Sequence, residues 1–246
     1  MKLIELEEVD STNDYLKREY KNLPMQTCVT AKYQTKGRGR NGHVWESHAN
    51  ENLIMSFLFK DFHKIEDAWK MTQLTTCSVV GLLDRYRIKA TIKWPNDIVL
   101  NRKKVCGILT EMNMEIDSIA YVVVGVGINV NRMEFREDIA ETATSLKKES
   151  GHSIERAELL SEILSAFFRD YKLFLEKQDL SPFLESYNQK LVNVGREVKI
   201  IKKGEEIIRT AIGINDRGEL IVQDAEGNTE HIFSGEVSVR GIYGYV

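Results

Sequence analysis

The sequence is poor in cysteine and in long apolar runs, and each shortage excludes a class of protein. Only 3 of its 246 residues are cysteines, far apart at Cys28, Cys77 and Cys106, so we expect neither a disulfide framework nor a CxxC zinc or redox motif. The longest apolar run, 119–126, is much too short to span a membrane. The start, MKLIELEEVD, turns acidic too early for a signal peptide. We therefore expect a cytoplasmic protein with no membrane association.

A basic excess is also missing. The chain has 34 lysines and arginines against 37 aspartates and glutamates, which gives a net charge of −3. General nucleic-acid binders usually carry a clear basic excess, so we expect no nucleic-acid partner. With 42% hydrophobic and 29% charged residues, the composition is that of an ordinary folded protein, which excludes intrinsic disorder. The length suits one large domain with a small appendage.

The spacing of apolar residues predicts a mixed α/β fold. Ser11 and Asp14 resemble a capping box, so the first helix should begin beside small polar side chains. Helices are expected over 13–20, 65–86, 154–178 and 182–191. Strands are expected over 2–9, 27–33, 53–59, 90–93, 97–100, 105–112 and 119–126.

The pattern changes after Asn193, where short strands alternate with turn sequences. This spacing is typical of a small β-barrel of about 50 residues. We therefore divide the chain into a domain of residues 1–192 and a C-terminal β-barrel domain of residues 193–246. The barrel strands are expected over 196–201, 207–214, 219–223 and 231–239.

The most informative segment is the glycine-arginine loop, residues 34–45 (QTKGRGRNGHVW). It has three lysines or arginines and no acidic residue before Glu46, and its three glycines let a ligand approach the backbone closely. Arginine suits phosphate or carboxylate groups. The same glycines spell GxGxxG, but a dinucleotide fold needs a helix directly after the motif, and 41–52 has no helical periodicity. A solvated surface loop is the alternative.

Three further segments carry polar residues at strand ends: 93–97 (KWPND), 104–109 (KVCGIL) and 125–131 (GVGINVN). A lysine at the start of a buried strand can reach into a cleft, and the two amides of the last segment could read the edge of a purine. Alone, each segment favours a structural role, such as a core position for Trp94. Together with the loop, they predict a nucleotide site with a second, carboxylate-bearing substrate.

These motifs resemble, in order and spacing, those of the biotin–protein ligases (biotin–[acetyl-CoA-carboxylase] ligases), from Ser11-Thr12-Asn13 to GVGINVN. The resemblance covers nearly the whole chain. It implies a class II synthetase-like α/β domain with a mixed sheet, followed by an SH3-like barrel. It also implies a reaction in which biotin and ATP form biotinyl-5′-AMP, with Mg²⁺ held largely by phosphates and water, and biotin then passes to a lysine of a biotin carboxyl carrier protein.

Position by position, the resemblance also implies roles for individual residues. Catalysis would depend on Lys104, which contacts the biotin carboxylate and the α-phosphate, with Arg40 and Asp97. No metal-ligating residues and no tightly bound prosthetic group are expected. The biotin pocket would be lined by Ser11, Thr12, Asn13, Gln34, Gly37, Arg38, Arg40, Lys104 and Gly107. ATP and the adenylate would contact Arg38, Arg40, Trp45, Asn96, Asn129, Glu236 and Arg240.

The sequence departs from the family at Asn41 and His43, where arginine is common, which makes the loop less cationic. Members with a regulatory role carry an N-terminal winged helix, and here the motifs begin at Ser11, so we expect no repressor function. Three alternatives stay open: a lipoate–protein ligase of the same superfamily, a non-enzymatic nucleotide-binding module, and an inactive homologue. A homodimer is compatible with the resemblance, but the sequence does not determine the oligomeric state.

Overall fold

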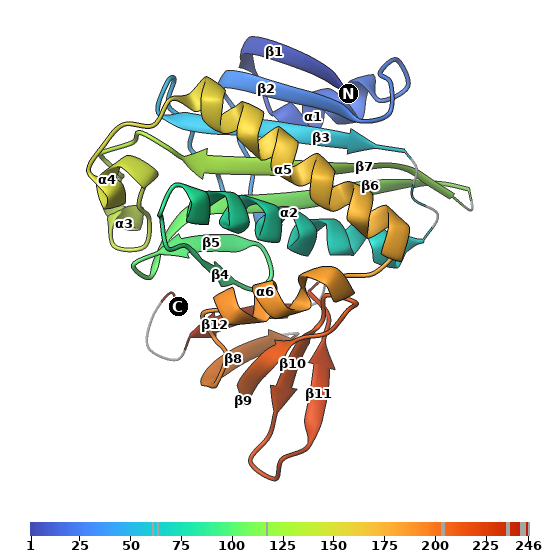
Figure 1. The fold of residues 1–246 in the computed structure, drawn as a ribbon, viewed down its shortest axis with the longest axis vertical. Coiled ribbons are helices and arrows are strands. Elements are labelled where there is room, and N and C mark those ends of the chain that lie inside the picture. The colour runs from blue at the N-terminus through green and yellow to red at the C-terminus, as the bar shows by residue number, and fades with distance from the viewer. Residues whose placement is uncertain are drawn as a thin grey trace.

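Two β-sheets, one large and one small, organise the chain (Figure 1). The structure is a computed structural model, and it describes all residues except 61, 63, 117, 203, 204, 235, 236, 242–244 and 246. The large sheet has seven strands in the order β1-β2-β3-β7-β6-β5-β4. Its strands are β1 (Lys2–Val9), β2 (Thr27–Gln34), β3 (Asn52–Phe59), β4 (Thr91–Lys93), β5 (Asp97–Leu100), β6 (Lys103–Glu115) and β7 (Ser118–Asn129).

The large sheet is mixed, as predicted. β1 runs parallel to β2, and every other neighbouring pair is antiparallel. Every residue of β3 is buried, because the sheet is covered on both faces at that strand. The central strands therefore read as continuous apolar runs rather than as alternating ones.

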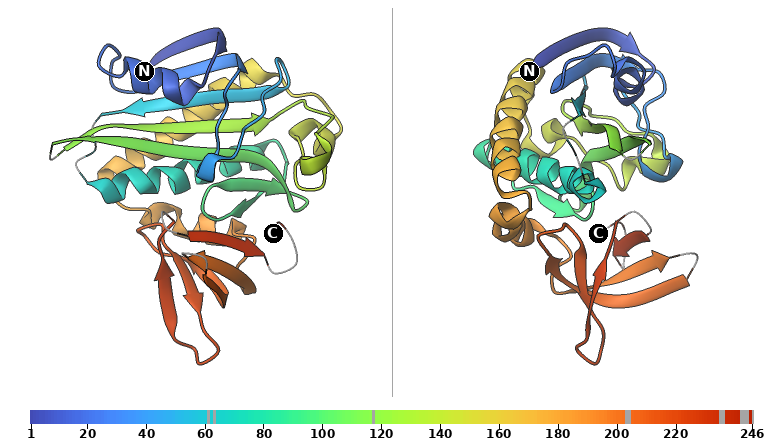
Figure 2. Two further views of the ribbon diagram at one scale, coloured as in Figure 1. Left: turned by 180° about the vertical axis from the view of Figure 1, so that it is seen from behind. Right: turned by 90° about the vertical axis from the view of Figure 1, so that its right-hand side faces the viewer.

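Two long helices, α2 (Ile65–Arg85) and α5 (Arg156–Lys177), cover one face of this sheet (Figure 2). Their amphipathic spacing predicted this, since one stripe of each helix is buried against the sheet. An aromatic cluster joins the layers: the ring of Phe57 in β3 stacks on Phe167 of α5 with centroids 4.6 Å apart. This side of the sheet is therefore occupied by core.

The opposite face carries α1 (Thr12–Glu19) and the glycine-arginine loop, which crosses β3, β7 and β6 in the left view of Figure 2. Helix α1 begins as predicted, because the Ser11 hydroxyl accepts a hydrogen bond from the Asp14 backbone N–H at 3.4 Å. The reciprocal half of a capping box is replaced, since the backbone N–H of Ser11 donates to the carboxylate of Asp10. This face is the one available for a site.

The glycine segment 125–131 differs from the prediction. We expected it to follow a strand, but β7 continues through Gly125 and Gly127 to Asn129. Gly127 lies in register with Gly107 of β6 on one side and with Ile54 of β3 on the other. Glycines in the middle of a strand mark a place where another group approaches the backbone closely.

Short helices connect the sheets and were only partly foreseen. The single helix expected over 182–191 is a 3-10 turn at Ser181–Phe183 followed by α6 (Leu184–Lys190). Two other short helices, α3 (Glu137–Ala140) and α4 (Leu146–Ser150), were not predicted, because a segment of one turn has no visible period.

The second sheet is antiparallel, with five strands in the order β11-β10-β9-β8-β12. The prediction of one strand over 231–239 was wrong, because one strand ends at Ile232 and another begins at Val237. The sheet docks on the large domain through Trp94, whose indole N–H donates to the carbonyl of Gly218 at 3.0 Å. Its strands are β8 (Arg196–Lys202), β9 (Glu205–Ile214), β10 (Leu220–Gln223), β11 (Thr229–Ile232) and β12 (Val237–Gly241).

The three cysteines are unpaired. Burial raises the pKa of Cys28 to about 12 and also raises the pKa values of Cys77 and Cys106, so all three stay protonated at neutral pH. Among the residues described, no helix combines the length and the apolar character needed to cross a bilayer.

Candidate functional site

Two adjoining cavities open on the sheet face that carries α1 and the glycine-arginine loop. The smaller has a volume of about 50 Å³. It lies between the start of α1, the loop and strands β3, β6 and β7. It is lined by Ser11, Thr12, Asn13, Gln34, Arg38, Gly39, Arg40, Trp45, Ile54, Met55, Asn96, Lys104, Gly107, Ile108, Gly125, Val126 and Gly127.

The floor of the small cavity is glycine. A methyl group on Gly127 would lie 2.5 Å from Cε2 of Trp45, and one on Gly107 would lie 3.2 Å from the same indole. A methyl group on Gly125 would overlap the side-chain amide of Asn13. The three glycines are therefore required for close approach, and the in-strand position of Gly125 and Gly127 follows from it.

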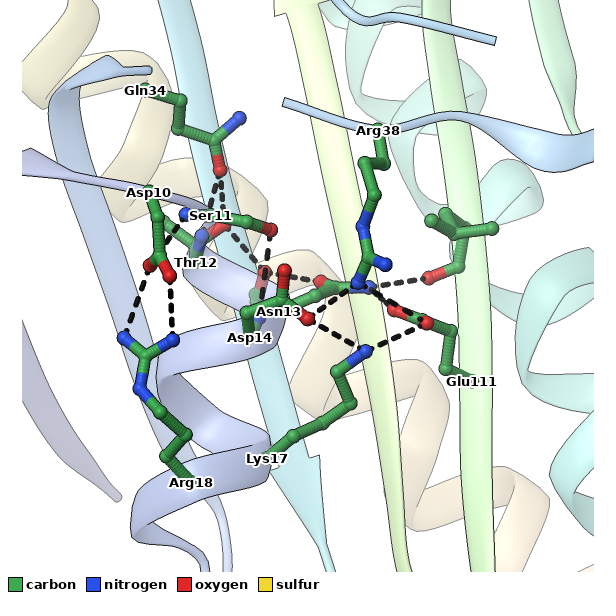
Figure 3. Close-up of polar contacts among 12 residues, drawn as sticks. Asp10, Ser11, Thr12, Asn13, Asp14, Lys17, Arg18, Gln34, Arg38 and Glu111 are labelled. Atoms are coloured by element: carbon green, nitrogen blue, oxygen red, sulfur yellow. Dashed lines mark hydrogen bonds and ion pairs between the residues drawn. The ribbon is translucent and has the colours of Figure 1, made fainter. Parts of the chain in front are cut away.

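Polar groups form one wall of the small cavity (Figure 3). The carbonyl oxygen of the Gln34 side chain accepts hydrogen bonds from the backbone N–H of Thr12 at 2.7 Å and from its hydroxyl at 3.0 Å. From β3, the Ser56 hydroxyl contacts the Thr12 hydroxyl at 2.7 Å and the Asn13 amide oxygen at 2.6 Å. All these side chains are buried, so the wall is fixed before any ligand arrives. Ser56 was not predicted, since it sits unmarked within an apolar strand.

The glycine-arginine loop is a β-hairpin rather than an irregular coil. Asn41 and Gly42 both have positive φ, 55° and 76°, and the His43 N–H donates to the Arg40 carbonyl at 3.1 Å. This is the geometry of a type I′ turn, for which Asn-Gly is a preferred sequence. Asn41, noted above as a departure from the family, thus has a structural role at the tip of the hairpin.

Trp45 follows the hairpin and lies over the glycine floor. Its indole N–H is buried and, among the described residues, has no hydrogen-bond partner. Buried donors normally find a partner, so this one is available to an acceptor on a ligand. Gly37 lines neither cavity, and instead its carbonyl accepts from the Trp45 backbone N–H at 3.0 Å.

The second cavity is larger, about 600 Å³, and adjoins the first at the loop. Helix α3, the β4–β5 turn and the segment that follows β7 form its wall with the C-terminal domain. Its lining residues are Gly39, Arg40, Asn41, His43, Val44, Trp45, Glu46, Lys93, Trp94, Pro95, Asn96, Asp97, Lys104, Asn129, Arg132, Phe135, Arg136, Ile139, Thr142, Ala143, Val239 and Tyr245.

The cavities share Lys104 and Asn96, with Asp97 beside them. The Lys104 ammonium lies 2.6 Å from a carboxylate oxygen of Asp97, and the Asn96 amide donates to the same oxygen at 3.2 Å. The other oxygen of Asp97 accepts from the phenol of Tyr245. Burial, followed by the charge of Asp97, raises the pKa of Tyr245, so the phenol stays protonated and donates.

Tyr245 was not predicted. Its ring lies under Lys93, with the ammonium 3.4 Å from the centroid. No local pattern near the C-terminus signals this role, because Tyr245 and Asp97 are 148 positions apart. Glu236, which was predicted to lie near ATP, falls outside the described residues, as does the side chain of Arg240.

Arg40 connects the loop to both domains. Its guanidinium donates to the Asn96 side chain at 3.2 Å and to the carbonyl of Ser234 in the C-terminal domain at 2.6 Å. Burial lowers the pKa of Arg40, and nearby Asp97 opposes that shift. Among the ion pairs that the described residues form, none includes Arg40. Its guanidinium contacts neutral oxygens and is therefore available to pair with an anionic ligand.

Arg38 is directed elsewhere. Its guanidinium forms an ion pair with Asp14 of α1 and lies 3.6 Å from Glu111 of β6 (Figure 3). Arg38 lines the small cavity, as predicted, but its guanidinium faces two carboxylates, whereas Arg40 faces the part that the two cavities share. Contact of Arg38 with biotin or the adenylate stays a prediction.

The two amides of the GVGINVN segment do not point to one side. Asn129 lines the large cavity, but its amide bonds to Asn52 at 2.8 Å and to the Thr144 carbonyl at 3.0 Å. Asn131 bonds to the backbone of Ile154 instead. Both amides are engaged in separate structural contacts, so the idea of a paired amide reader is wrong, while adenine contact by Asn129 stays a prediction.

A buried ion pair lies beside the hairpin in the wall of the large cavity. Arg132, with 4% of its side chain exposed, lies 2.8 Å from Glu46, whose other oxygen lies 2.8 Å from Arg136. Because Glu46 follows Trp45, this pair joins the loop to the segment after β7. Within the described part of the chain, no group of three His, Cys, Asp or Glu side chains could hold a metal ion.

Comparison with known proteins gives a consistent result over both domains. The sequence model of the biotin/lipoate A/B protein ligase family matches residues 5–129, and that of the biotin protein ligase C-terminal domain matches 194–240. The bifunctional ligase/repressor BirA of Bacillus subtilis is 33% identical over 221 residues, 89% of this chain and 67% of that protein. BirA of Escherichia coli is 30% identical over 94% of this chain and 72% of that protein.

Solved structures agree. The biotin protein ligase of Aquifex aeolicus, in complex with biotin and ATP, superposes with a TM-score of 0.85 at 34% identity, covering 98% of this chain and 99% of that one. Its R40G mutant, in complex with biotin, superposes with a TM-score of 0.84 at 33% identity. The mixed sheet and the small antiparallel domain are shared with these proteins.

Proposed function

Because the chain belongs to the biotin/lipoate A/B protein ligase family, we infer that it is an ATP-dependent biotin–protein ligase. It activates biotin with ATP as biotinyl-5′-AMP and transfers the biotinyl group to a lysine of a biotin carboxyl carrier protein. The observation that carries this function is that the two cavities meet at Arg40, Trp45 and Lys104, which line both. A carboxylate in the small cavity and a phosphate in the large one would face each other there.

We propose that the small cavity holds biotin. Its glycine floor and the indole of Trp45 suit a compact apolar bicycle, and the wall of Ser11, Thr12, Asn13 and Gln34 suits a polar head with both donors and acceptors. The large cavity is proposed to hold ATP. Its lining combines cations with the rings of Phe135 and Tyr245, which suits a charged chain attached to an aromatic base.

Lys104 is the proposed centre of the first step. The biotin carboxylate attacks the α-phosphorus of ATP, an oxygen–phosphorus bond forms, and pyrophosphate leaves. Two anions must approach each other, so catalysis depends on positive charge and alignment. Lys104 stands at the meeting point and Arg40 beside it, while Asp97 holds the ammonium in place until the substrates arrive. Mg²⁺ enters with ATP as part of that substrate.

In the second step, the amine of the acceptor lysine attacks the acyl carbon of the adenylate and AMP leaves. The adenylate is a mixed anhydride that water would hydrolyse, so it must be sheltered meanwhile. The hairpin that carries Arg38 and Arg40 lies over the small cavity and is the proposed shelter. No nucleophilic cysteine is needed, in keeping with the raised pKa values of the buried thiols.

The domain boundary, the cellular location and the partners of the protein are also proposed. A boundary at residues 192–193 is supported by the separate sheets and by the family model that starts at 194. A cytoplasmic location and the absence of nucleic-acid and membrane partners stay predictions, and the net charge of −3 supports the absence of a nucleic-acid partner. A homodimer also stays a prediction.

The test is mass spectrometry of a biotin carboxyl carrier domain incubated with this protein, biotin and Mg-ATP. We expect the mass of one biotinyl group on a single lysine, and none when ATP is omitted. A parallel incubation with lipoate and a lipoyl domain examines the alternative substrate. Transfer of lipoate with none of biotin would overturn the proposal in favour of a lipoate–protein ligase. A protein that binds nucleotide but modifies neither domain would be a binding module.

A further inference from the structure

The ion-paired group around Arg38 is not used by the proposed mechanism. Its members are Arg38 on the hairpin, Asp14 and Lys17 on α1, and Glu111 on β6 (Figure 3). Lys17 lies 2.7 Å from Asp14 and 2.8 Å from Glu111, and Arg38 pairs with Asp14 and approaches Glu111 at 3.6 Å. Two cations thus alternate with two carboxylates, and the group is neutral overall.

The carboxylates are held in position without help from the loop. Asp14 and Lys17 are three residues apart on α1, and Lys17 reaches across to Glu111 on the sheet. Burial lowers the pKa of Lys17, but its hydrogen bonds to Asp14 and Glu111 outweigh that effect and the pKa is raised overall. Lys17 therefore stays charged and keeps the two acids together. When the hairpin moves, Arg38 would leave a receptor that remains assembled.

Glu111 also reaches the small cavity. One of its oxygens accepts a hydrogen bond from the Asn13 side-chain amide at 2.8 Å, while the other carries the contacts to Lys17 and Arg38. The oxygen of the Asn13 amide in turn accepts from Ser56, so the amide orientation is fixed. A single carboxylate therefore connects a side chain of the cavity wall with the arginine of the loop.

We propose that Asp14 and Glu111 are positioning residues that latch the hairpin over the adenylate by binding Arg38. This proposal rests on the proposed function, since it names what holds the shelter shut between the two steps. In this arrangement Arg38 does not serve as a ligand of the phosphate, which is left to Arg40 and Lys104. Asn13 links the latch to occupancy of the small cavity through Glu111.

The strength of the latch suits a reversible closure. The side chains of Arg38, Glu111 and Asp14 are 45%, 27% and 24% exposed, so water and salt partly screen their attraction. Half-exposed ion pairs of this kind change an equilibrium by about two- to fivefold each. The latch should therefore slow release of the adenylate without preventing the opening that transfer requires. It should also weaken as ionic strength rises.

The experiment measures the rate at which preformed biotinyl-AMP leaves the protein, by stopped-flow fluorescence, between 50 mM and 500 mM KCl. The variants are Glu111→Gln, Asp14→Asn, Arg38→Gln and each pair with Arg38→Gln. Glutamine keeps an acceptor oxygen for Asn13 but has no charge for Arg38. Arg18→Gln is the matched control, because the Arg18 guanidinium, on the same helix, pairs with the carboxylate of Asp10 and not with a side chain of the hairpin.

We expect Glu111→Gln and Asp14→Asn each to speed release about two- to fivefold at low salt, with Arg18→Gln unchanged. The wild-type rate should rise with salt and the variant rates should rise less. In the Arg38→Gln background neither acid substitution should add a further effect, because its partner is gone. Full additivity in that background, or equal salt dependence in all variants, would overturn the latch.

Failure of the latch can be told apart from failure of the proposed function. Biotin-dependent pyrophosphate exchange by the wild-type protein tests whether it forms the adenylate, and absent exchange would show that the proposed function is wrong. The latch is judged separately, because release is measured with preformed biotinyl-AMP and does not depend on exchange. If exchange is normal and release follows the outcomes just given, the two questions are answered separately. Thermal unfolding of each variant excludes a loss of fold as the cause.

Discussion

The two cavities are built in different ways. The small one is lined by neighbouring strands β3, β6 and β7 and by the cap of α1, and its polar wall is hydrogen-bonded among its own residues. The large one draws on the hairpin, the β4–β5 turn, the segment after β7 and the C-terminal domain. The floor and polar wall of the first are set by sheet register and the start of α1, with the loop as its cover, whereas the second depends on segments that meet only when both domains and the loop are in place.

This difference predicts how each side responds to change. A side built from packed strands should discriminate sharply by shape, because its atoms cannot move to accommodate a substitution. A side assembled from mobile or distant segments should adapt, so single changes there should weaken binding gradually. The largest losses of activity should come from substitutions where the two cavities meet, since a residue there contacts both substrates.

Lys104→Ala tests the meeting point. We expect biotin-dependent pyrophosphate exchange to fall about 10²–10³-fold, because the ammonium stabilises charge that develops during attack on the phosphorus. Biotin binding should weaken less than exchange. Lys103→Ala is the control, since Lys103 contacts the carbonyl of Ala140 and lines neither cavity. Near-normal exchange by Lys104→Ala would remove this residue from the mechanism.

Arg40→Ala tests the connection between loop and domains. The substitution removes the contacts with Asn96 and the Ser234 carbonyl together with a charge, so biotinyl-AMP should dissociate about 10- to 100-fold faster while the protein still folds. Release monitored by tryptophan fluorescence gives the rate, and a thermal melt checks the fold. An unchanged release rate would show that the hairpin does not retain the adenylate.

Gly127→Ala tests the rigidity of the small cavity. The added methyl group would meet Trp45 at 2.5 Å, and displacing the ring should weaken biotin binding about tenfold. Isothermal titration calorimetry measures this directly. Gly81→Ala is a matched control, because its methyl group would meet nothing within 4 Å and should only stabilise helix α2. Equal biotin affinity for Gly127→Ala and wild type would mean that the small cavity adapts to the added methyl group and is not rigid.

Tyr245→Phe tests the adaptable side and should have the smallest effect. It removes the hydrogen bond to Asp97 but keeps the ring under Lys93, so we expect the KM for ATP to rise about three- to tenfold with biotin affinity unchanged. Tyr33→Phe, an exposed position on β2, is the control. A larger change in biotin affinity than in the KM for ATP would show that Tyr245 acts on the small cavity and contradict this prediction.

The sequence predicted what is local. Ser11 predicts the start of α1, and the spacing of apolar residues predicts α2, α5 and most strands, because each of these patterns lies within one segment. The continuation of β7 through Gly127 was missed, since glycine normally breaks a strand and only the approach of Trp45 explains it here. Most of the residues that the family pattern predicts for the site line one of the two cavities, while their roles in binding and catalysis stay predictions.

What could not be predicted depends on residues far apart in the chain. Glu111 meets Lys17 across 94 positions, and Tyr245 meets Asp97 across 148. Charged residues on a helix or a strand usually face solvent, so nothing in their neighbourhood marks them as partners. The direction of Arg38 could not be foreseen either, because two arginines two residues apart in a hairpin look alike until their surroundings are known.

The low reactivity of the native thiols has a practical consequence for following the motion of the hairpin. Since all three native cysteines have raised pKa values, a cysteine introduced at the exposed tip residue His43 would be the thiol that reacts first with a maleimide dye near neutral pH. One covalent label could then report, in single molecules, how long the hairpin stays closed before the biotinyl group is transferred to the carrier protein. The raised pKa values of the three native cysteines thus leave the protein suited to single-molecule spectroscopy without a cysteine-free background.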